Sequence, residues 1–184
     1  MRLGLSALLS IVFLAIPVAA HASIEDYASY DAPRKCHPAP RVGTDVLAHW
    51  IVKRYGGGFG GISRSCTKKD GPTSEHQEGR AFDWTLDAAS KPDRLHAKAF
   101  MQRIFDADKR GNDDAWARRM GIMYLIWNDE MYPAWNGFRP EPYLSSSCKT
   151  TKKCSTTLRH RNHVHISLSR PGANGRTSWY ENRR

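Results

Sequence analysis

The sequence predicts an α+β fold, with a mostly antiparallel central sheet flanked by helices. Some segments have apolar residues at helical spacing. Between them lie short segments in which apolar and polar residues alternate, or in which every residue is apolar; both patterns are typical of strands. These segments do not follow the regular strand–helix–strand order that produces a parallel sheet, and the sequence contains no internal repeat. The elements are therefore expected to form one mixed domain.

The first 22 residues are predicted to be a secretory signal rather than part of the fold. Arg2 provides a positive start, Leu3 to Val18 is almost wholly apolar, and Ala20-His21-Ala22 places small residues where a signal peptidase reads them. The apolar run is too short for a lasting membrane span, and a retained anchor is the alternative. No other segment is apolar enough to cross a bilayer. We expect a secreted protein with no stable membrane insertion after cleavage.

The remaining chain has the size of one domain with an ordinary core. We expect an extended segment over residues 23–43 and a single domain over residues 44–184. The signal segment holds one of the 28 basic residues and none of the 18 acidic ones, so the mature chain has a net charge of +9. This charge favours anionic partners such as cell-wall polymers, although it is also compatible with no partner at all. We expect a monomer.

Four cysteines predict two disulfides, because an even number in an exported chain is typical of a disulfide framework. Three pairings are possible. Local spacing favours Cys148–Cys154 across a polar loop, which leaves Cys36–Cys66. A metal site built from thiolates is the alternative, but the sequence has no C-x-x-C pair.

Three segments are predicted to be helices. The first is capped by Thr44-Asp45 and ends at the glycine-rich stretch Gly56–Gly61. This stretch lacks the lysine and the hydroxyl residue of a phosphate-binding loop, so we expect a turn there. The second helix opens at Lys91-Pro92 and runs to about Asp108, and a shorter third helix covers Asp113–Met120.

Four segments are predicted to be strands. Ile62–Arg64 is a short candidate, and Arg80–Leu86 and His163–Ser169 alternate as half-buried strands do. The continuous apolar run Ile122–Trp127 is typical of a buried central strand. Residues 129–160 are expected to be mainly loops.

Two short segments carry histidines and an aspartate in a pattern suited to metal binding. His76 and Asp83 can converge if the chain folds back at Gly79, and His163 and His165 point to the same side of an alternating strand. Zinc accepts imidazole nitrogen and carboxylate oxygen, and a catalytic zinc site uses three protein ligands and a water. Ordinary surface histidines are the alternative explanation.

The stretch from Ser74 to Asp83 resembles the S-x-H-x-x-G-x-A-x-D signature of a metallopeptidase superfamily, at all five fixed positions. That superfamily groups D-Ala-D-Ala carboxypeptidases and dipeptidases, lysostaphin-type endopeptidases and the hedgehog signalling domain. His163-Val164-His165 resembles its closing H-x-H motif. The two motifs cover about 13 residues. The chain is also similar to small actinobacterial secreted domains of this type.

The resemblance implies a D-Ala-D-Ala-peptidase-like and hedgehog-like fold in which Zn²⁺ is held by His76, Asp83 and His165. It places His163 beside the water on the metal and makes Arg64 the positional candidate for stabilising an oxyanion. The implied reaction is hydrolysis of peptide bonds in peptidoglycan stems or bridges. In such sites zinc lowers the pKa of its water to about 7.

The chain departs from the carboxypeptidase and dipeptidase branch at one position. That branch has a Glu or Asp three residues before the last ligand, where this chain has Asn162, which cannot take a proton. His163 or His160 could act as the general base instead, because an imidazole titrates near neutral pH. If neither does, the protein is a non-catalytic zinc-stabilised module that binds the cell wall or another anion.

Other charged and aromatic residues have less specific patterns. Glu75 and Glu78 are expected to be exposed turn residues rather than substrate contacts. Trp84 is expected to face the core, away from Asp83, whereas Trp135 is a candidate groove residue. Basic residues before the H-x-H strand could steer an anionic polymer towards the site. These are Lys149, Lys152, Lys153, Arg159 and Arg161.

A secreted nuclease is a third functional class, suggested by the basic charge and by the stretch His160–His163. The sequence lacks the acidic cluster that such an enzyme would use for its metal, and its first motif is of the peptidase type. We therefore expect no specific nucleic-acid partner.

Overall fold

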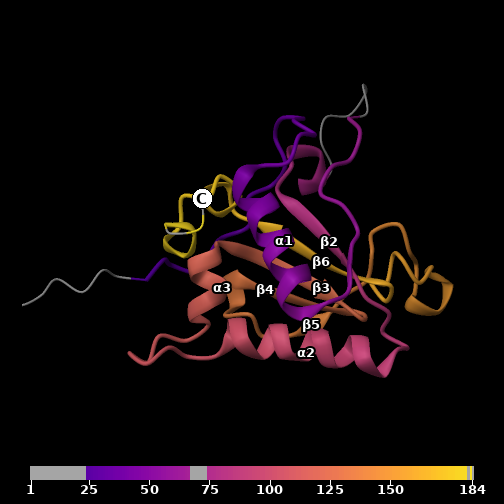
Figure 1. Cartoon of the computed structure of the whole chain (residues 1–184). Coiled ribbons are helices and arrows are strands. Elements are labelled where there is room, and N and C mark those ends of the chain that lie inside the picture. Colours follow the sequence, from indigo (N-terminus) through magenta and orange to yellow (C-terminus); the bar gives the residue numbers. More distant parts are fainter. Residues whose placement is uncertain (1–23, 67–73, 182, 184) are drawn as a thin grey trace, which may run out of the picture.

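The computed structural model describes residues 24–66, 74–181 and 183. The predicted signal segment lies outside the described residues. The described residues form an α+β fold, in which an open antiparallel sheet of six strands packs against four helices (Figure 1). The predicted fold class is confirmed.

The sheet has the strand order β1-β2-β6-β3-β4-β5, and each neighbouring pair is antiparallel. Its central position is taken by β6, the last strand along the chain, which pairs with β2 on one side and with β3 on the other. Both sides of β6 are therefore joined to strands far away in sequence. The strands are β1 Gly58–Phe59, β2 Ala81–Thr85, β3 Ile122–Trp127, β4 Glu130–Pro133, β5 Glu141–Pro142 and β6 His163–Leu168.

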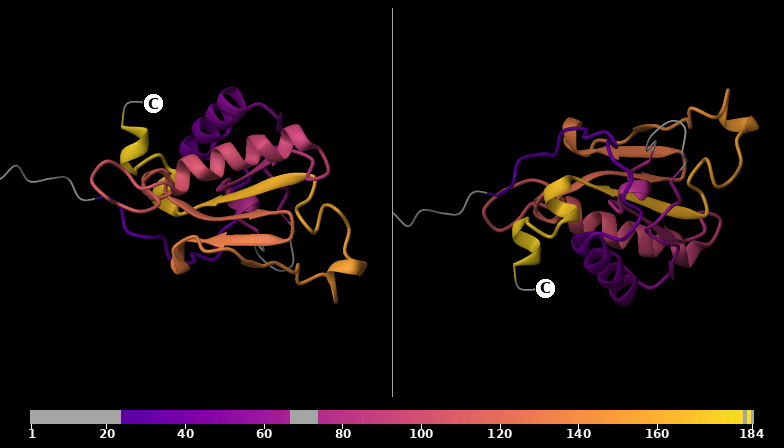
Figure 2. Two further views of the ribbon diagram at one scale, coloured as in Figure 1. Left: turned by 90° about the horizontal axis from the view of Figure 1, so that it is seen from below. Right: turned by 90° about the horizontal axis from the view of Figure 1, so that it is seen from above.

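The two long helices lie next to each other on one side of the strands (Figure 2). Their apolar side chains form one core with side chains from the facing surface of β2, β3 and β6. Each large side chain buried in this way contributes roughly 1.5–3 kcal/mol to folding. The helices are α1 Val42–Tyr55, α2 Lys91–Phe105, α3 Ala115–Met120 and α4 Arg170–Ala173.

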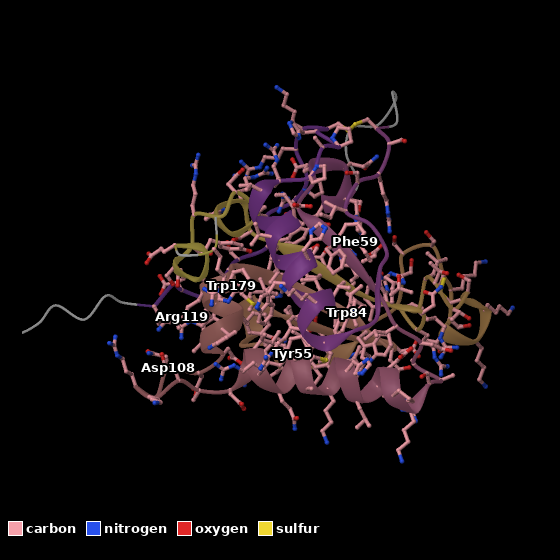
Figure 3. All side chains as sticks on the ribbon, viewed as in Figure 1. Tyr55, Phe59, Trp84, Asp108, Arg119 and Trp179 are labelled. Carbon is pink, nitrogen blue, oxygen red and sulfur yellow. A yellow bond between two sulfur atoms is a disulfide. The ribbon has the colours of Figure 1, made fainter. Side chains whose placement is uncertain are left out.

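Trp84 is fully buried in this core, as predicted (Figure 3). Its indole Nε1–H donates to the carbonyl oxygen of Gly56 at 2.8 Å, and its ring packs edge-on against Phe100 at 5.6 Å between ring centroids. Because side chains alternate along a strand, Trp84 in the core directs its neighbour Asp83 to the opposite face of the sheet.

The first helix begins at Val42, before the predicted Thr44-Asp45 cap. Thr44 is buried inside its first turn, and no side chain caps the helix. A Cβ on Gly43 would lie 2.1 Å from the carbonyl oxygen of Gly172, so the helix start packs directly against α4. Tertiary packing sets this boundary. The second helix ends at Phe105 rather than near Asp108, whose carboxylate instead accepts hydrogen bonds within the following turn.

Three short strands differ from the predictions. Ile62–Arg64 is not a strand; the edge strand is β1, inside the glycine-rich stretch that was expected to be a turn. The pair β4 and β5 lies within residues 129–160, which were expected to be loops. The turn between β3 and β4 consists of Asn128 and Asp129, both with positive φ (51° and 69°), as a type I′ hairpin turn requires.

Both predicted disulfides are present. Cys36–Cys66 joins the segment before α1 to the loop after β1, and Cys148–Cys154 closes the loop between β5 and β6. Two disulfides are consistent with an extracellular location. Among the described residues, no helix has the length and apolar character needed to cross a membrane.

Glu78 is buried, so the prediction of an exposed turn residue is wrong. Its Oε1 accepts hydrogen bonds from the backbone N–H groups of Arg34 and Lys35, and its Oε2 accepts one from Arg80 at 2.7 Å. The Arg170 guanidinium lies 3.2 Å away. Burial alone would raise the pKa of Glu78, but these donors outweigh burial and lower the pKa to about 2.

Replacing Glu78 with Gln is therefore expected to lower the free energy of unfolding by about 3 kcal/mol, because the buried Arg80 loses its charged partner. The ionised carboxylate stabilises the fold above its unfolded pKa of 4.5, and this contribution disappears as the pH falls towards about 2. Urea unfolding between pH 7 and pH 3 should show the difference between wild type and E78Q shrinking in acid. The control is Glu181→Gln, at an exposed position; equal stability of E78Q and wild type at pH 7 would contradict the argument.

Candidate metal centre

Three side chains from separate segments converge on one point. His76 comes from the 3-10 helix η1 (Glu75–Glu78), Asp83 from β2 and His165 from β6. The Nε2 atom of His76 lies 3.0 Å from Oδ1 of Asp83 and 3.2 Å from Nδ1 of His165, and these last two atoms are 3.1 Å apart. A tetrahedral zinc site with bonds of 2.0–2.1 Å has donor-to-donor edges of about 3.3 Å. The three residues could therefore hold a metal ion at three corners of a tetrahedron.

Two local features bring His76 and Asp83 together. Gly79 ends η1 with a φ of +66°, and a Cβ there would lie 2.1 Å from the carbonyl oxygen of Ala39. Any other residue at position 79 would have to adopt this unfavourable positive φ, and its Cβ would clash with Ala39. Asp83 and His165 are direct partners across the β2–β6 ladder, so their side chains leave the sheet on the same face.

A hydrogen bond at one ring nitrogen of His76 determines which nitrogen can bind a metal. Nδ1 lies 2.7 Å from the carbonyl oxygen of Ile62, which can only accept, so Nδ1 carries the proton and Nε2 offers a lone pair. His76 is 1 % exposed, and this burial lowers its pKa, which keeps the ring neutral at pH 7. A neutral imidazole is the form that binds a metal.

Asp83 presents its two carboxylate oxygens to different groups. Oδ1 faces the two imidazoles, and Oδ2 accepts a hydrogen bond from Nη2 of Arg64 at 3.0 Å. Burial alone would raise the pKa of Asp83, but the imidazoles of His165 and His76 outweigh it and lower the pKa well below its usual range. The Asp83 side chain is 16 % exposed, so solvent reaches the centre at this point.

His163 lies beside the three donors. Its Nε2 is 3.6 Å from Oδ1 of Asp83, and its Nδ1 lies 2.8 Å from the side-chain oxygen of Asn162. Because that oxygen accepts, Nδ1 is the protonated nitrogen and Nε2 has a free lone pair. Nε2 is buried without a hydrogen-bond partner among the described residues. Burial lowers the pKa of His163, so the ring is neutral at pH 7.

His160 stands next to His163, with 4.8 Å between the ring centroids, and the edge of the Tyr143 ring packs against it at 5.0 Å. Its backbone has a φ of 49°, a conformation uncommon for a residue with a side chain. Burial, followed by the charges of His165 and His163, lowers its pKa to about 3. Its Nδ1 is buried without a hydrogen-bond partner in the described part of the chain.

The six predicted site residues thus lie near one another: three donors, two further imidazoles and Arg64. Arg64 contacts the distal oxygen of Asp83, and its side chain is 52 % exposed.

The other basic and aromatic residues singled out in the sequence lie around this cluster. Three lysines are exposed in the disulfide-closed loop, namely Lys149, Lys152 and Lys153, whereas Arg159 is ion-paired with Asp129 at 2.7 Å. Trp135 is 43 % exposed and contacts Tyr124 at 6.1 Å between ring centroids.

Glu75 is 4 % exposed, so the prediction of an exposed turn residue is wrong here too. It accepts a hydrogen bond from the hydroxyl of Tyr124, whose ring stacks on His165. Sequence reasoning did not single out Tyr124, which lies within an apolar run, or Ser167, which is buried two residues after His165. The period of two along β6 is the signal that could have pointed to Ser167.

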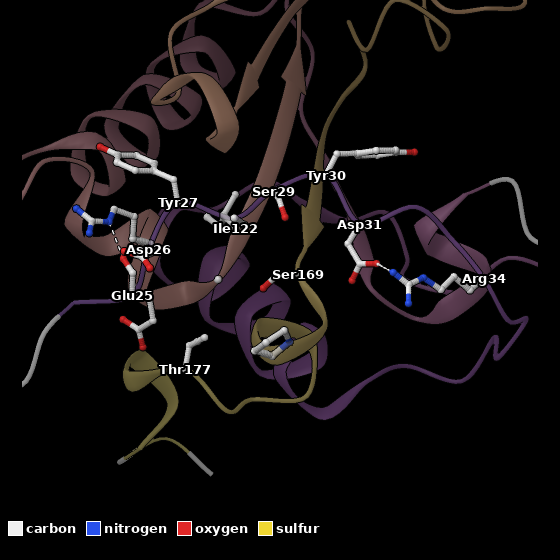
Figure 4. A pocket seen from close by; sticks show the side chains of 14 residues that line it. Glu25, Asp26, Tyr27, Ser29, Tyr30, Asp31, Arg34, Ile122, Ser169 and Thr177 are labelled. Carbon is white, nitrogen blue, oxygen red and sulfur yellow. Dashed lines mark hydrogen bonds and ion pairs between the residues drawn. The ribbon is translucent and has the colours of Figure 1, made fainter.

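Several surface cavities of about 370–580 Å³ are lined by residues other than the three metal donors. One of about 410 Å³ lies between the chain before α1, the start of β3 and α4, and is lined by residues such as Tyr27, Tyr30, Ser169 and Thr177 (Figure 4). None of its lining residues is His76, Asp83 or His165. Unlike this cavity, the donor cluster combines convergent ligand atoms with neighbouring imidazole nitrogens that have no hydrogen-bond partner among the described residues.

Comparison with known families gives one match. Residues 38–152 match the family described as VldE, C-terminal domain, and this match covers more than half of the chain. The chain belongs to this family. No curated protein and no solved structure matches. The matched range contains His76 and Asp83 and ends before His165. No comparison names the D-Ala-D-Ala peptidase and hedgehog superfamily.

Proposed function

We propose that this VldE C-terminal domain is a secreted zinc-dependent hydrolase of the D-Ala-D-Ala-peptidase type that cleaves peptide bonds in peptidoglycan. The proposal rests on one observation. Two imidazole nitrogens and a carboxylate oxygen lie 3.0–3.2 Å apart, next to two neutral imidazoles with unused nitrogens. A mixed nitrogen and oxygen donor set of this kind suits zinc. A zinc ion bound there supplies Lewis acidity towards a carbonyl oxygen and a water molecule.

His163 is the proposed general base. Its Nδ1–H is held by Asn162, which leaves the Nε2 lone pair directed towards the metal donors. Nε2 can take the proton of the attacking water and later deliver it to the leaving amine. Asn162, at the position where the carboxypeptidase branch has an acid, would thus orient the base. His160 packs on the His163 ring and is the alternative base.

Arg64 is proposed to stabilise negative charge on the substrate. Its guanidinium is bound to Asp83 through one nitrogen, and its half-exposed side chain has further N–H donors. A permanent positive charge next to the metal donors favours a developing oxyanion. The guanidinium could also bind a substrate carboxylate in a carboxypeptidase reaction.

An anionic cell-wall polymer is the proposed partner around the site. Between Glu141 and Glu181 the chain contains no acidic residue, and the three lysines of this stretch are exposed in the loop closed by Cys148–Cys154. This loop projects at the end of the sheet where β6 begins (Figure 1). Its positive charge would raise the local concentration of an anionic substrate near His163.

The function is tested by incubating zinc-loaded protein, and metal-free protein as the control, with peptidoglycan and with short D-alanyl peptides. We expect new amino groups only with the zinc-loaded protein, and mass spectrometry then identifies the bond that is cut. Full zinc occupancy without any release of amines from these substrates would refute the peptidase proposal. Plasmid DNA in a parallel incubation is expected to stay intact.

A non-catalytic zinc-stabilised binding module is the second candidate. It is favoured by Asn162, which replaces the acid of the carboxypeptidase branch, and by the position of the 410 Å³ cavity away from the donors. This candidate predicts that zinc raises the melting temperature and that the protein sediments with peptidoglycan without turnover. The same incubations therefore separate the two functions.

A further inference from the structure

A chain of buried polar groups leads away from the candidate metal centre. The Nε2 atom of His165 lies 2.9 Å from the hydroxyl of Ser167. Ser167 is the cross-strand partner of Tyr124, so the two side chains leave the sheet on the same face, next to each other. The hydroxyl of Tyr124 donates to Oε2 of Glu75 at 2.8 Å. The exposed fractions are 0 % for Ser167, 8 % for Tyr124 and 4 % for Glu75, so the chain is shielded from solvent.

The chemistry of these groups gives the chain a direction. The Tyr124 hydroxyl donates to Oε2 of Glu75, because a carboxylate oxygen accepts. When Nδ1 of His165 offers its lone pair to a metal, Nε2 carries the ring proton, and the Ser167 hydroxyl oxygen at 2.9 Å is its acceptor. In this arrangement Ser167 fixes the tautomer in which Nδ1 faces the metal donors.

Tyr124 also constrains the plane of the His165 ring. The two rings are stacked, with 5.5 Å between centroids and 24° between planes. In addition, Glu75 immediately precedes His76 in η1, so the Tyr124–Glu75 hydrogen bond links the segment of one donor to the ring that stacks on another. The contacts therefore act on the tautomer, on the ring orientation and on the relative position of two donors.

We propose that Ser167, Tyr124 and Glu75 are positioning residues that hold His165 as an Nδ1 donor and thereby set the metal affinity of the centre. The proposal rests on the proposed metal site and adds residues that are not among the fixed positions of either motif. Partners behind a metal-binding histidine typically change metal affinity by 10- to 100-fold when they are removed. The alternative is that the three groups merely satisfy one another in the interior.

The test uses the full mature chain and the variant Tyr124→Phe, which keeps the stacked ring and removes the hydroxyl. Zinc affinity, measured by competition with a chromophoric chelator, is expected to fall by about 10- to 100-fold. Ser167→Ala is expected to have a similar effect. The matched control is Tyr180→Phe, since the buried Tyr180 hydroxyl donates to the carbonyl oxygen of Met120 in the core, away from the metal donors. It should change zinc affinity by less than about twofold.

A spectroscopic measurement distinguishes positioning from simple structural satisfaction. In Co²⁺-substituted protein the visible absorption bands report the ligand field, and we expect them to shift in Y124F and S167A but not in Y180F. In zinc-loaded wild type, the Nε2–H proton of His165 should be visible by NMR and protected from exchange with water. A rapidly exchanging proton there would overturn the proposal even if the variants did not fold.

The outcomes separate this proposal from the proposed function. Wild type that binds no zinc would refute the metal site itself. Wild type that binds zinc, together with a Y124F variant of equal affinity and an unchanged cobalt spectrum, would refute the positioning role and leave the metal site standing.

Discussion

Replacing His165 with Ala should lower the zinc affinity of the protein by about 100- to 1000-fold, the loss expected when one of three protein donors is removed. Asp83→Asn should have a comparable effect, because the charged oxygen at 3.0–3.1 Å from both imidazoles becomes neutral. Metal content after dialysis and chelator competition measure the loss. The melting temperature of wild type should rise with zinc, and that of the variants should not.

The matched control for this experiment is His49→Ala. The His49 side chain is 67 % exposed on α1, so the change removes an imidazole without touching the donor cluster. Its zinc affinity should equal that of wild type. A His165→Ala protein that retained one tightly bound zinc per chain would show that the ion binds elsewhere, and the proposed chemistry would lose its basis.

The second large effect is expected for His163→Ala, which should keep zinc within a fewfold of wild type but lower kcat by about 100- to 10,000-fold. The reason is that His163 contacts Asp83 only at 3.6 Å and offers the free Nε2 lone pair for proton transfer. The two measurements are zinc affinity and the rate of amine release from a D-alanyl peptide. Loss of zinc in this variant would make His163 a ligand, and full activity would exclude it as the base.

The pH dependence of the same reaction gives an independent check. Burial lowers the pKa of His163 below the ordinary 6.5 of an imidazole, and the base must be neutral to act. The acid limb of kcat/KM should therefore lie below pH 6.5, with zinc occupancy measured at each pH. An acid limb of kcat/KM above pH 6.5 would contradict the assignment of buried His163 as the base.

Local patterns were sufficient for the main elements, and together with the motif resemblance they were sufficient for the donors. Alternation in Arg80–Leu86 and His163–Ser169, together with the apolar run Ile122–Trp127, predicted the three central strands, because each period reflects which face is buried. The turn at Gly79 predicted that His76 and Asp83 converge, and the resemblance to the metallopeptidase motifs added His165 as the third donor of the cluster. These features are local, so a single sequence reveals them.

The misassigned residues depend on partners that are distant in sequence. Glu78 is buried because Arg170 and the backbone at Arg34 and Lys35 surround it. The sequence of the turn itself gives no sign of these partners. Glu75 likewise meets Tyr124 from another element. The β3–β4 hairpin is different, since Asn128-Asp129 after an apolar run is a local turn signal, and it was available in the sequence.

The central place of β6 has a consequence for how the protein matures. Without residues 163–168, β1 and β2 on one side and β3, β4 and β5 on the other have no strand to join them, and the cluster lacks its third donor. A chain that has been synthesised only up to a point before residue 163 therefore cannot complete the cluster, so the proposed cation would bind only after the last strand is in place. For the same reason, a fragment cut at residue 152, where the family match ends, would be unable to assemble.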